Sequence, residues 1–492
     1  MAGKRYQSVI PVRVNFYDLP HNRTNSSGKD SYYKNCYPEQ LVSGMQGQTP
    51  RLVVTGRPGT GSPLYSVGAL TARGQFVWKE NLYQVYGNAV YKNGSALTVT
   101  LSSSTGKVYW TEMSGGSTSE KLFLLAGNDI YSIKTDGTVT LQNNPSTPDS
   151  YVGTMAGGII NLDGYILYCD TDGKINHNAT QNDTAANITW ASNIISANIY
   201  ADGQKGIARH LNYVVSFGDW STEFFYNAGN TSGSILARAE GTVLRYGTCN
   251  FATLWQDENI ICWLARSRDG GNCVMILDGL TPKIVSTQPI EKIINEDTDL
   301  SQANGFGTRI AGHIFYFLQL PASNKTLVFS LTNNTWCEWT SYNGVTETYF
   351  NAYDIRTYMS GGVTKAIVQG LSDGNTYPLD INNYSDNGNA IKTKIVTDVI
   401  DFQTAQSKFL PVLTLLGDRT EATANISMRY TDDDYKTWST AQVKDMQYIP
   451  VWRALGRFNR RAFEFTYEAN YPFRVEALEF GLKLGTYAQG RA

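Results

Sequence analysis

Short apolar runs separated by turn residues dominate the chain, and helical periodicity is almost absent. Most runs hold four to seven residues rich in Val, Ile, Tyr and Phe, and are bounded by Gly, Asn or Asp-Gly. The two clearest signals place a Gly-Asn turn between apolar strands, at Gly87-Asn88 and again 40 residues later at Gly127-Asn128. This pattern predicts β-hairpins along most of the chain.

The hairpin signals recur at a nearly regular spacing. Five more follow the first two, at residues 165–169, 213–217, 260–264, 314–318 and 366–368. From Val85 to Ile367 there are six steps, with a mean of 47 residues per step. A period of about 40–50 residues with several short strands per unit is typical of β-propeller blades. The repeats are degenerate, so we predict about six to seven blades over residues 61–380; a chain of β-sandwiches stays open as the alternative.

Two regions lie outside the repeat. Residues 1–60 are polar and irregular, and we expect them to close onto the propeller. The Asn-rich stretch 381–389 is typical of a linker, and alternating strands such as 426–430 and 463–467 follow it. The predicted fold class is therefore all-β: a β-propeller plus a C-terminal β-sandwich-like domain over residues 381–492.

Composition narrows the classes of function. The chain has 41 Lys+Arg and 43 Asp+Glu, a net charge of −2, which excludes a general nucleic-acid binder and an acidic tail. No apolar stretch approaches the 18 or so residues of a membrane span, and no secretory signal is visible, so we expect no stable membrane association. The six cysteines are scattered without a CxxC pair, which is typical of free core thiols in a reducing compartment.

Familiar enzyme sites are missing from the sequence. The four histidines form no HxH or HExxH pattern, and His313, inside an apolar strand, is expected to be a core residue. Neither a GxSxG nucleophile motif nor a phosphate-binding loop is present. Residues 170–173 are similar to the start of a calcium loop, but its later ligands are missing, so a hairpin turn explains them better. We predict no catalytic residue, cofactor or metal, and hence no enzyme.

The segment 431–438 is similar to the Asp-box of sialidases and other propellers, with Tyr435 where that motif has Gly. In that motif the Asp caps a hairpin turn and the Trp packs beneath it, so the segment predicts a hairpin. Nothing in the sequence selects the three arginines that a sialidase would need. A glycan-binding or sialidase-like propeller protein nevertheless stays open as the alternative function.

A basic cluster between residues 452 and 461 holds four arginines and no acidic residue: Arg453, Arg457, Arg460 and Arg461. Arginine offers paired donors to phosphate and carboxylate groups, so these residues are candidates for subunit-interface or DNA-channel contacts. The other interpretation is a strand whose solvent face is rich in arginine.

Several stretches, in order along the chain, resemble one family: the tail hub or nozzle proteins of short-tailed bacteriophages, also called packaged-DNA stabilisation proteins. The stretches that carry the resemblance are Asn35-Cys36-Tyr37-Pro38-Glu39, Arg57-Pro58-Gly59, Leu162-Asp163-Gly164-Tyr165, residues 217–229, residues 284–291, Trp438-Ser439 and residues 452–457. Residues 1–30 and the insertions near 175–190 and 380–390 have no counterpart in this resemblance.

The resemblance implies a structural virion protein without catalysis or cofactors. Such proteins form a homo-hexameric tube below the portal and its adaptor ring, which continues the DNA channel, retains packaged DNA and supports tail fibres or spikes and a needle or plug. It implies a place in the virion tail, after assembly in the bacterial host cytoplasm. A trimeric host-recognition fibre protein is a further alternative.

Overall fold

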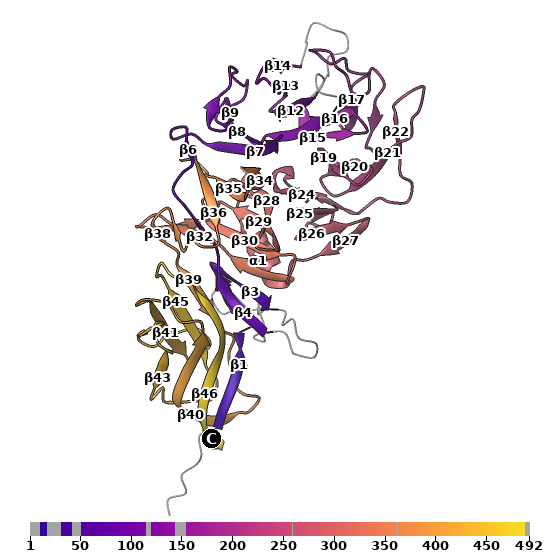
Figure 1. Ribbon diagram of the computed structural model, residues 1–492. Coiled ribbons are helices and arrows are strands. Elements are labelled where there is room, and N and C mark those ends of the chain that lie inside the picture. Colours follow the sequence, from indigo (N-terminus) through magenta and orange to yellow (C-terminus); the bar gives the residue numbers. More distant parts are fainter. Residues whose placement is uncertain are drawn as a thin grey trace, which may run out of the picture.

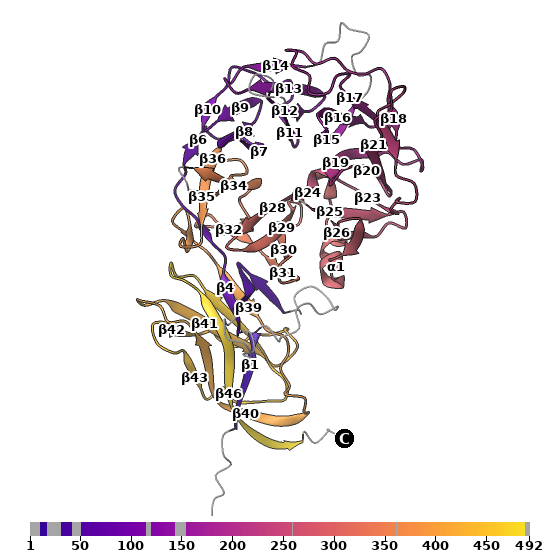
Figure 2. The ribbon, with the colours of Figure 1, turned by 45° about the vertical axis from the view of Figure 1, so that its right-hand side comes forward.

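The computed structural model describes residues 10–16, 31–41, 51–114, 120–142, 154–257, 259–360 and 363–487. Within this part of the chain nearly every regular element is a β-strand, and α1 (Gln288–Glu296) is the single α-helix. The strands form a disc of blades and a second β-domain that extends from the rim of the disc (Figures 1 and 2). The predicted all-β fold, with a propeller and an additional β-domain, is confirmed.

Seven blades surround the propeller axis in the described part of the chain (Figure 2). Blade 1 comprises β7 (Ala72–Trp78), β8 (Asn81–Tyr86), β9 (Ala89–Lys92) and β10 (Ser95–Ala96). Blade 2 comprises β11 (Tyr109–Met113), β12 (Lys121–Ala126), β13 (Asp129–Lys134) and β14 (Val139–Leu141). Blade 3 comprises β15 (Met155–Leu162), β16 (Tyr165–Asp170), β17 (Lys174–His177) and β18 (Ile195–Ser196). Blade 4 comprises β19 (Gln204–His210), β20 (Tyr213–Gly218), β21 (Thr222–Asn227) and β22 (Leu236–Arg238). Blade 5 comprises β23 (Tyr246–Thr248), β24 (Trp255–Asp257), β25 (Ile260–Ser267), β26 (Asn272–Asp278) and β27 (Thr281–Ile284). Blade 6 comprises β28 (Asn304–Ile310), β29 (His313–Leu320), β30 (Lys325–Ser330) and β31 (Thr335–Glu338). Blade 7 comprises β34 (Asp354–Ser360), β35 (Val363–Gln369) and β36 (Asn375–Asp380), together with β5 (Gly59–Thr60) and β6 (Tyr65–Ser66).

The hairpin signals of the sequence map one to each blade. The Gly-Asn pairs at Gly87 and Gly127 form the turns β8–β9 and β12–β13, where both glycines have positive φ. The other five signals lie in the second strands of blades 3 to 7, which are β16, β20, β25, β29 and β35. The 47-residue period therefore measures the distance from one blade to the next.

Blades 3 and 4 are joined by a backbone bridge. A parallel bridge between Gly157 and Gly206 joins them into one eight-stranded sheet. A Cβ atom on either glycine would overlap the ring of Phe251, which packs over the bridge. Only glycine permits this approach of two backbones and an aromatic ring.

The ring is closed by a segment that precedes blade 1. Strands β5 and β6 pair with β36, so blade 7 takes its outer strands from residues 59–66. Buried amides join blades 1 and 7: Gln75 Nε2 donates to Asp354 O at 3.0 Å, and Gln369 Nε2 donates to Val85 O at 3.0 Å. Hydrogen bonds from both ends of the repeat thus hold the disc closed.

The second β-domain contains two sheets whose strands come from both ends of the chain. The first holds β1 (Ile10–Asn15), β3 (Cys36–Leu41), β4 (Arg51–Gly56), β40 (Gln406–Gly417), β43 (Val451–Arg453), β44 (Arg457–Phe458) and β46 (Arg474–Tyr487). The second holds β2 (Tyr32–Lys34), β39 (Thr393–Val396), β41 (Asn425–Thr431), β42 (Gln442–Asp445) and β45 (Ala462–Tyr467). Aromatic rings from the two sheets meet between them, with the centroids of Phe463 and Phe480 5.7 Å apart.

One nine-stranded sheet connects the two regions. Strand β2 pairs with β31 of blade 6 on one side and with β39 on the other, so the sheet of blade 6 continues into the second domain. The largest hydrophobic cluster also crosses the junction, from Phe317 and Trp339 in the propeller to Tyr33 and Phe465 in the second domain. The two regions therefore share backbone hydrogen bonds and a core.

The described part of residues 1–60 differs from the predicted irregular segment. Residues 10–15, 32–34, 36–41 and 51–56 are strands of the second domain, and only residues from 59 onward close the propeller. Residues 1–9, 17–30 and 42–50 lie outside the described residues. Strands β3 and β4 form a hairpin with each other, but β1, β2 and β4 also pair with strands more than 300 residues away, which a local sequence pattern does not reveal.

A buried ion pair lies at this junction, in the stretch predicted to be a linker. Residues 385–390 form a short hairpin, β37 (Ser385–Asp386) with β38 (Asn389–Ala390). Arg57, whose side chain is fully buried, pairs with Asp386. The guanidinium also donates to Asn35 Oδ1 at 2.9 Å and to Thr340 O at 2.8 Å. One arginine thus connects the N-terminal strands, the segment that follows blade 6 and the stretch that follows blade 7.

Candidate functional site

The four arginines of the basic cluster do not form one surface, because Arg461 is part of the core. Its side chain is 1% exposed and binds Asp432 with two hydrogen bonds, of 2.6 and 2.7 Å. It also donates to Leu455 O at 2.6 Å and lies over the rings of Tyr430 and Phe458. The prediction that this arginine contacts a partner needs correction: its side chain stabilises the fold of the second domain.

Arg460 is exposed and forms an ion pair with Asp434. The two motifs that the sequence analysis treated separately, the Asp-box-like segment and the basic cluster, therefore lie against each other. Asp432 and Asp434 flank the turn of the segment, and each binds one arginine of the cluster. Half of the positive charge of the cluster is thus paired within the chain.

The Asp-box-like segment forms the predicted hairpin turn between β41 and β42. Asp433 accepts hydrogen bonds from the backbone amides of Lys436 and Thr437 and from the Thr437 hydroxyl, at 2.6–3.1 Å, which holds the pKa of this carboxyl well below its usual range. Tyr435 stands at the glycine position of the motif with a φ of 64°, and its hydroxyl donates to Thr397 O at 2.7 Å. The role of the segment is structural.

Arg453 and Arg457 remain on the outer face of the first sheet, with Phe409 and Lys483. Phe409 is directly paired with Arg457 on one neighbouring strand and with Lys483 on the other, so the three residues form one row across β44, β40 and β46. Phe409 is 44% exposed. Within the described residues no carboxylate forms an ion pair with the three cations. We call Arg453, Arg457, Lys483 and Phe409 the basic face.

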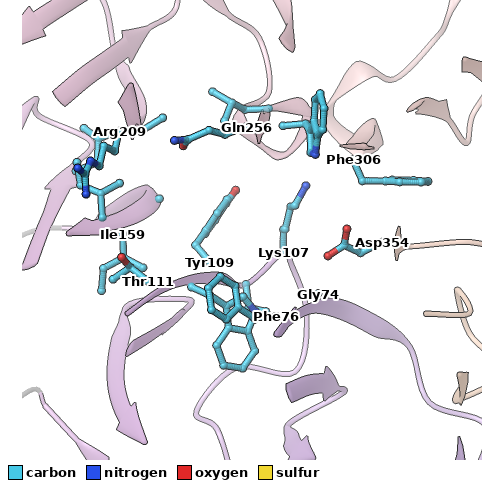
Figure 3. A pocket seen from close by; sticks show the side chains of 18 of the residues that line it. Gly74, Phe76, Lys107, Tyr109, Thr111, Ile159, Arg209, Gln256, Phe306 and Asp354 are labelled. Atoms are coloured by element: carbon cyan, nitrogen blue, oxygen red, sulfur yellow. The ribbon is translucent and has the colours of Figure 1, made fainter. Parts of the chain in front are cut away.

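The bore of the propeller holds a cavity of about 540 Å³. All seven blades or the segments that join them contribute to its lining, and Lys107, Tyr109 and Asp354 extend into it (Figure 3). Its carboxylates are partly paired: Asp354 binds Arg356 at 3.1 Å, and Asp257 binds Arg309 at 2.8 Å.

Two side chains cross the bore. Lys107 enters just before blade 2, and its Nζ donates to Ala252 O at 2.7 Å and Gly305 O at 2.6 Å, at the inner ends of blades 5 and 6. The ring of Tyr109 meets that of Phe251, with centroids 5.5 Å apart. Burial lowers the pKa of Lys107 to about 8, while the carbonyl oxygens accept hydrogen bonds from the ammonium form. A single lysine side chain therefore spans the bore at this level.

His313 and five of the six cysteines are buried in the core. His313 is buried and stacks on Phe315 with centroids 5.7 Å apart, as predicted, and burial lowers its pKa. The six cysteines are free thiols, all of them buried except Cys249, which is partly exposed. No cluster of three or more His, Cys, Asp or Glu side chains with the geometry of a metal site occurs in the described ranges. Among the described helices, none has the length and apolar character of a membrane span.

The fold is a seven-bladed β-propeller, crossed at its axis by Lys107, with a second β-domain that carries the basic face. The model of the family described as "Bacteriophage P22 Gp10, beta-propeller" matches residues 28–382. The match covers more than half of the chain, so the chain belongs to this family, whose members stabilise packaged phage DNA. The resemblance seen in the sequence is confirmed: the chain is a structural protein of a phage tail and a component of the virion.

The individual proteins compared with this chain resemble it only weakly. No curated protein matches. Among solved structures, virginiamycin B lyase from Staphylococcus aureus matches with a TM-score of 0.38 at 10% identity, over 70% of this chain and 99% of that one. The N-terminal domain of Nup159 matches with a TM-score of 0.39 at 8% identity, over 69% of this chain and 98% of that one. The WD40 propeller of Doa1 matches with a TM-score of 0.35 at 12% identity, over 66% and 97%. These scores are too low to support an argument about function.

Proposed function

We propose that six copies of this chain form a ring, the hub or nozzle of a phage tail, below the portal and its adaptor. The observation that carries the proposal is the closed bore, which Lys107 crosses to reach blades 5 and 6. A DNA duplex, whose major groove alone is about 12 Å wide, does not pass through a bore that one lysine side chain spans. A channel for DNA in this family therefore needs several copies around a common axis.

The charge of the chain suits a channel through which DNA passes. Its net charge is −2, with only 17% charged residues. A channel dense in lysine and arginine would bind phosphates strongly and resist ejection of the genome. A nearly neutral ring encloses the packaged DNA without holding it by ion pairs.

The basic face is the surface that we assign to a partner in the tail. Its cations form no ion pair with described residues: Arg457 and Lys483 lie on either side of the exposed Phe409, and Arg453 lies farther along β40, opposite Val412. Arginines with an aromatic ring at the centre are typical of protein interfaces, and the cations would bind carboxylates of a neighbouring copy or of the adaptor. Fibres or spikes and a needle or plug complete the proposed set of partners, and assembly takes place in the cytoplasm of the bacterial host.

Mass measurement and electron cryomicroscopy test the ring. The purified chain, alone or with its adaptor, is expected to give a species of six times 54.5 kDa. Density for the chain is expected around the tail axis of the virion, with DNA or a plug at the centre of the ring. A chain that stays monomeric with its adaptor, and that is absent from the tail axis, would contradict the proposal.

Charge reversal tests the basic face. We expect Arg453→Glu to reduce the yield of DNA-filled virions at least tenfold while the circular dichroism and melting temperature of the isolated chain stay unchanged. The matched control is Arg268→Glu, an exposed arginine in a turn of blade 5. Equal virion yields for the face variant and the control would remove the basic face from the proposed assembly.

A further inference from the structure

A second pocket, of about 620 Å³, is lined by other residues than the bore cavity and the basic face, although its Asn304 accepts a hydrogen bond from Lys107 Nζ at 3.1 Å. It forms between blades 6 and 7, the hairpin β32 (Thr340–Tyr342) with β33 (Glu347–Tyr349), and the hairpin β37–β38. Its volume falls within the range of about 300–1,000 Å³ that is typical of sites for small ligands.

Aromatic side chains form one part of its lining. Tyr349 and Tyr353 contribute, together with Phe350, which lies between them in the sequence. Phe350 is buried and covers the guanidinium of Arg57, whose centre is 4.9 Å from the centroid of the ring. The Arg57 charge is therefore held behind the aromatic lining and is already paired with Asp386.

The polar groups of the lining differ in whether they already form hydrogen bonds within the chain. The carboxylate of Asp373 is fully engaged: it accepts hydrogen bonds from the Tyr377 hydroxyl at 2.8 Å, Asn351 Nδ2 at 3.0 Å and the Asn375 amide at 2.9 Å. In contrast, the hydroxyls of Tyr349 and Tyr353 and the side chains of Asn387 and Asn389 form no hydrogen bond with other described residues. The lining groups that form no hydrogen bond within the described chain are thus neutral hydroxyls and amides.

This combination selects a class of ligand. A phosphate or carboxylate would need a cation in the pocket, and no Lys, Arg or His is among the residues that line it. The Arg57 guanidinium lies behind Phe350, and the Lys392 ammonium lies over the ring of Tyr342, 3.7 Å from its centroid. A purely apolar ligand would bury the amides and hydroxyls without partners, which costs binding free energy. A ligand with an apolar C–H face for the aromatic rings and a set of hydroxyls for the amides meets both demands, because each amide both donates and accepts. We propose that the pocket binds a neutral saccharide.

The experiment measures saccharide binding to the isolated chain. Saturation-transfer NMR with a panel of neutral hexoses and N-acetylhexosamines, and with their short oligomers, is expected to show transfer to at least one member. Sialic acid serves as the anionic comparison and is expected to give no transfer. Titration with the best member is expected to yield an affinity that Tyr349→Ala and Asn389→Ala each weaken at least fivefold. The matched control is Tyr448→Ala, an exposed tyrosine on the second domain that is 67% exposed.

The possible results of this experiment distinguish the saccharide site from the proposed hexameric ring. If no neutral saccharide shows transfer, or if only sialic acid does, the proposal is wrong, whatever the oligomeric state. If Tyr349→Ala instead prevents ring formation and leaves saccharide transfer unchanged, the pocket is an interface between copies and the proposal is also wrong. Retained melting temperatures in the variants show that a loss of affinity reflects the pocket and not the fold.

Discussion

The propeller and the second β-domain are built from the same kind of element but in opposite ways. Blades 1 to 6 are each formed by a continuous stretch of chain, in which neighbouring strands are joined mostly by short turns. The second domain pairs β1 with β46, so that Ile10 lies opposite Leu482, and it places β2 between β31 and β39. Contacts within these blades are local, whereas the second domain also pairs strands from the two ends of the chain.

This difference shows which strand pairings a local sequence pattern can predict and which it cannot. A hairpin between near neighbours repeats its turn residues and its apolar alternation, so a series of blades produces a measurable period. A strand whose partner lies hundreds of residues away leaves no such period, and a strand of three residues such as β2 is too short to show an alternation of its own. Pairings of this kind also form late and slowly, because closing a long loop costs entropy before any contact is gained.

The largest effect is expected where the two regions meet. Arg57→Met leaves Asp386 buried without its partner and removes hydrogen bonds to Asn35 and Thr340. We expect a loss of about 3–5 kcal/mol in the free energy of unfolding, measured by urea denaturation. Wild type is expected to unfold in one transition and the variant in two, because the junction separates first.

The control for this experiment is Arg13→Met. Arg13 forms an ion pair of 3.1 Å with Glu476, but its side chain is 51% exposed, so a loss of less than about 1 kcal/mol is expected. If the two variants were equally stable, the junction would not couple the propeller to the second domain.

Within the second domain, Arg461 and Arg460 form a matched pair of tests. Arg461→Met removes a two-bond ion pair with Asp432 and leaves Leu455 O without its donor, so a loss of about 2–3 kcal/mol is expected. Arg460→Met breaks an exposed ion pair and is expected to cost less than about 1 kcal/mol. Thermal unfolding measures both, and the reverse order would show that the basic cluster does not divide into core and surface.

Inside the propeller, Lys107 offers a test that depends on pH. Lys107→Met leaves Ala252 O and Gly305 O without a donor, and a loss of about 1–2 kcal/mol is expected at pH 7. Because the folded protein has a Lys107 pKa of about 8, below the ordinary value of about 10.4, the unfolded chain binds more protons between these two values. The unfolding free energy of wild type relative to the variant should therefore rise from pH 8 to pH 10, and a constant difference would contradict this account.

The smallest effect is expected at the turn of the Asp-box-like segment. Tyr435→Phe keeps the ring but removes the hydrogen bond to Thr397 O, for an expected loss of about 1 kcal/mol. Tyr448→Phe changes a tyrosine that is 67% exposed and is the control, with no measurable change expected in the melting temperature. Equal melting temperatures for the two variants would mean that the hydroxyl of Tyr435 does not hold the turn.

The candidate sites were predictable only in part. Four arginines within nine residues indicated a basic surface, and Arg453 and Arg457 are indeed exposed. That Arg461 turns inward was not predictable, because its partner Asp432 belongs to a motif that the sequence presented as a separate feature. Lys107, which closes the bore, had no sequence signal at all: a lysine before a short strand is ordinary until the blades place carbonyl oxygens around it.

The sequence by itself determined the all-β class, the repeat of about 47 residues and the resemblance to a phage tail family, since each depends on residues close together in the chain or on ordered motifs. The tertiary structure alone decided which strands complete blade 7, where residues 10–56 belong, and which charges are paired. The physical reason is the range of the interactions. Turns and strand alternation are set by neighbours along the chain, whereas pairing across the junction is set by which backbone and charged groups the closed ring brings together.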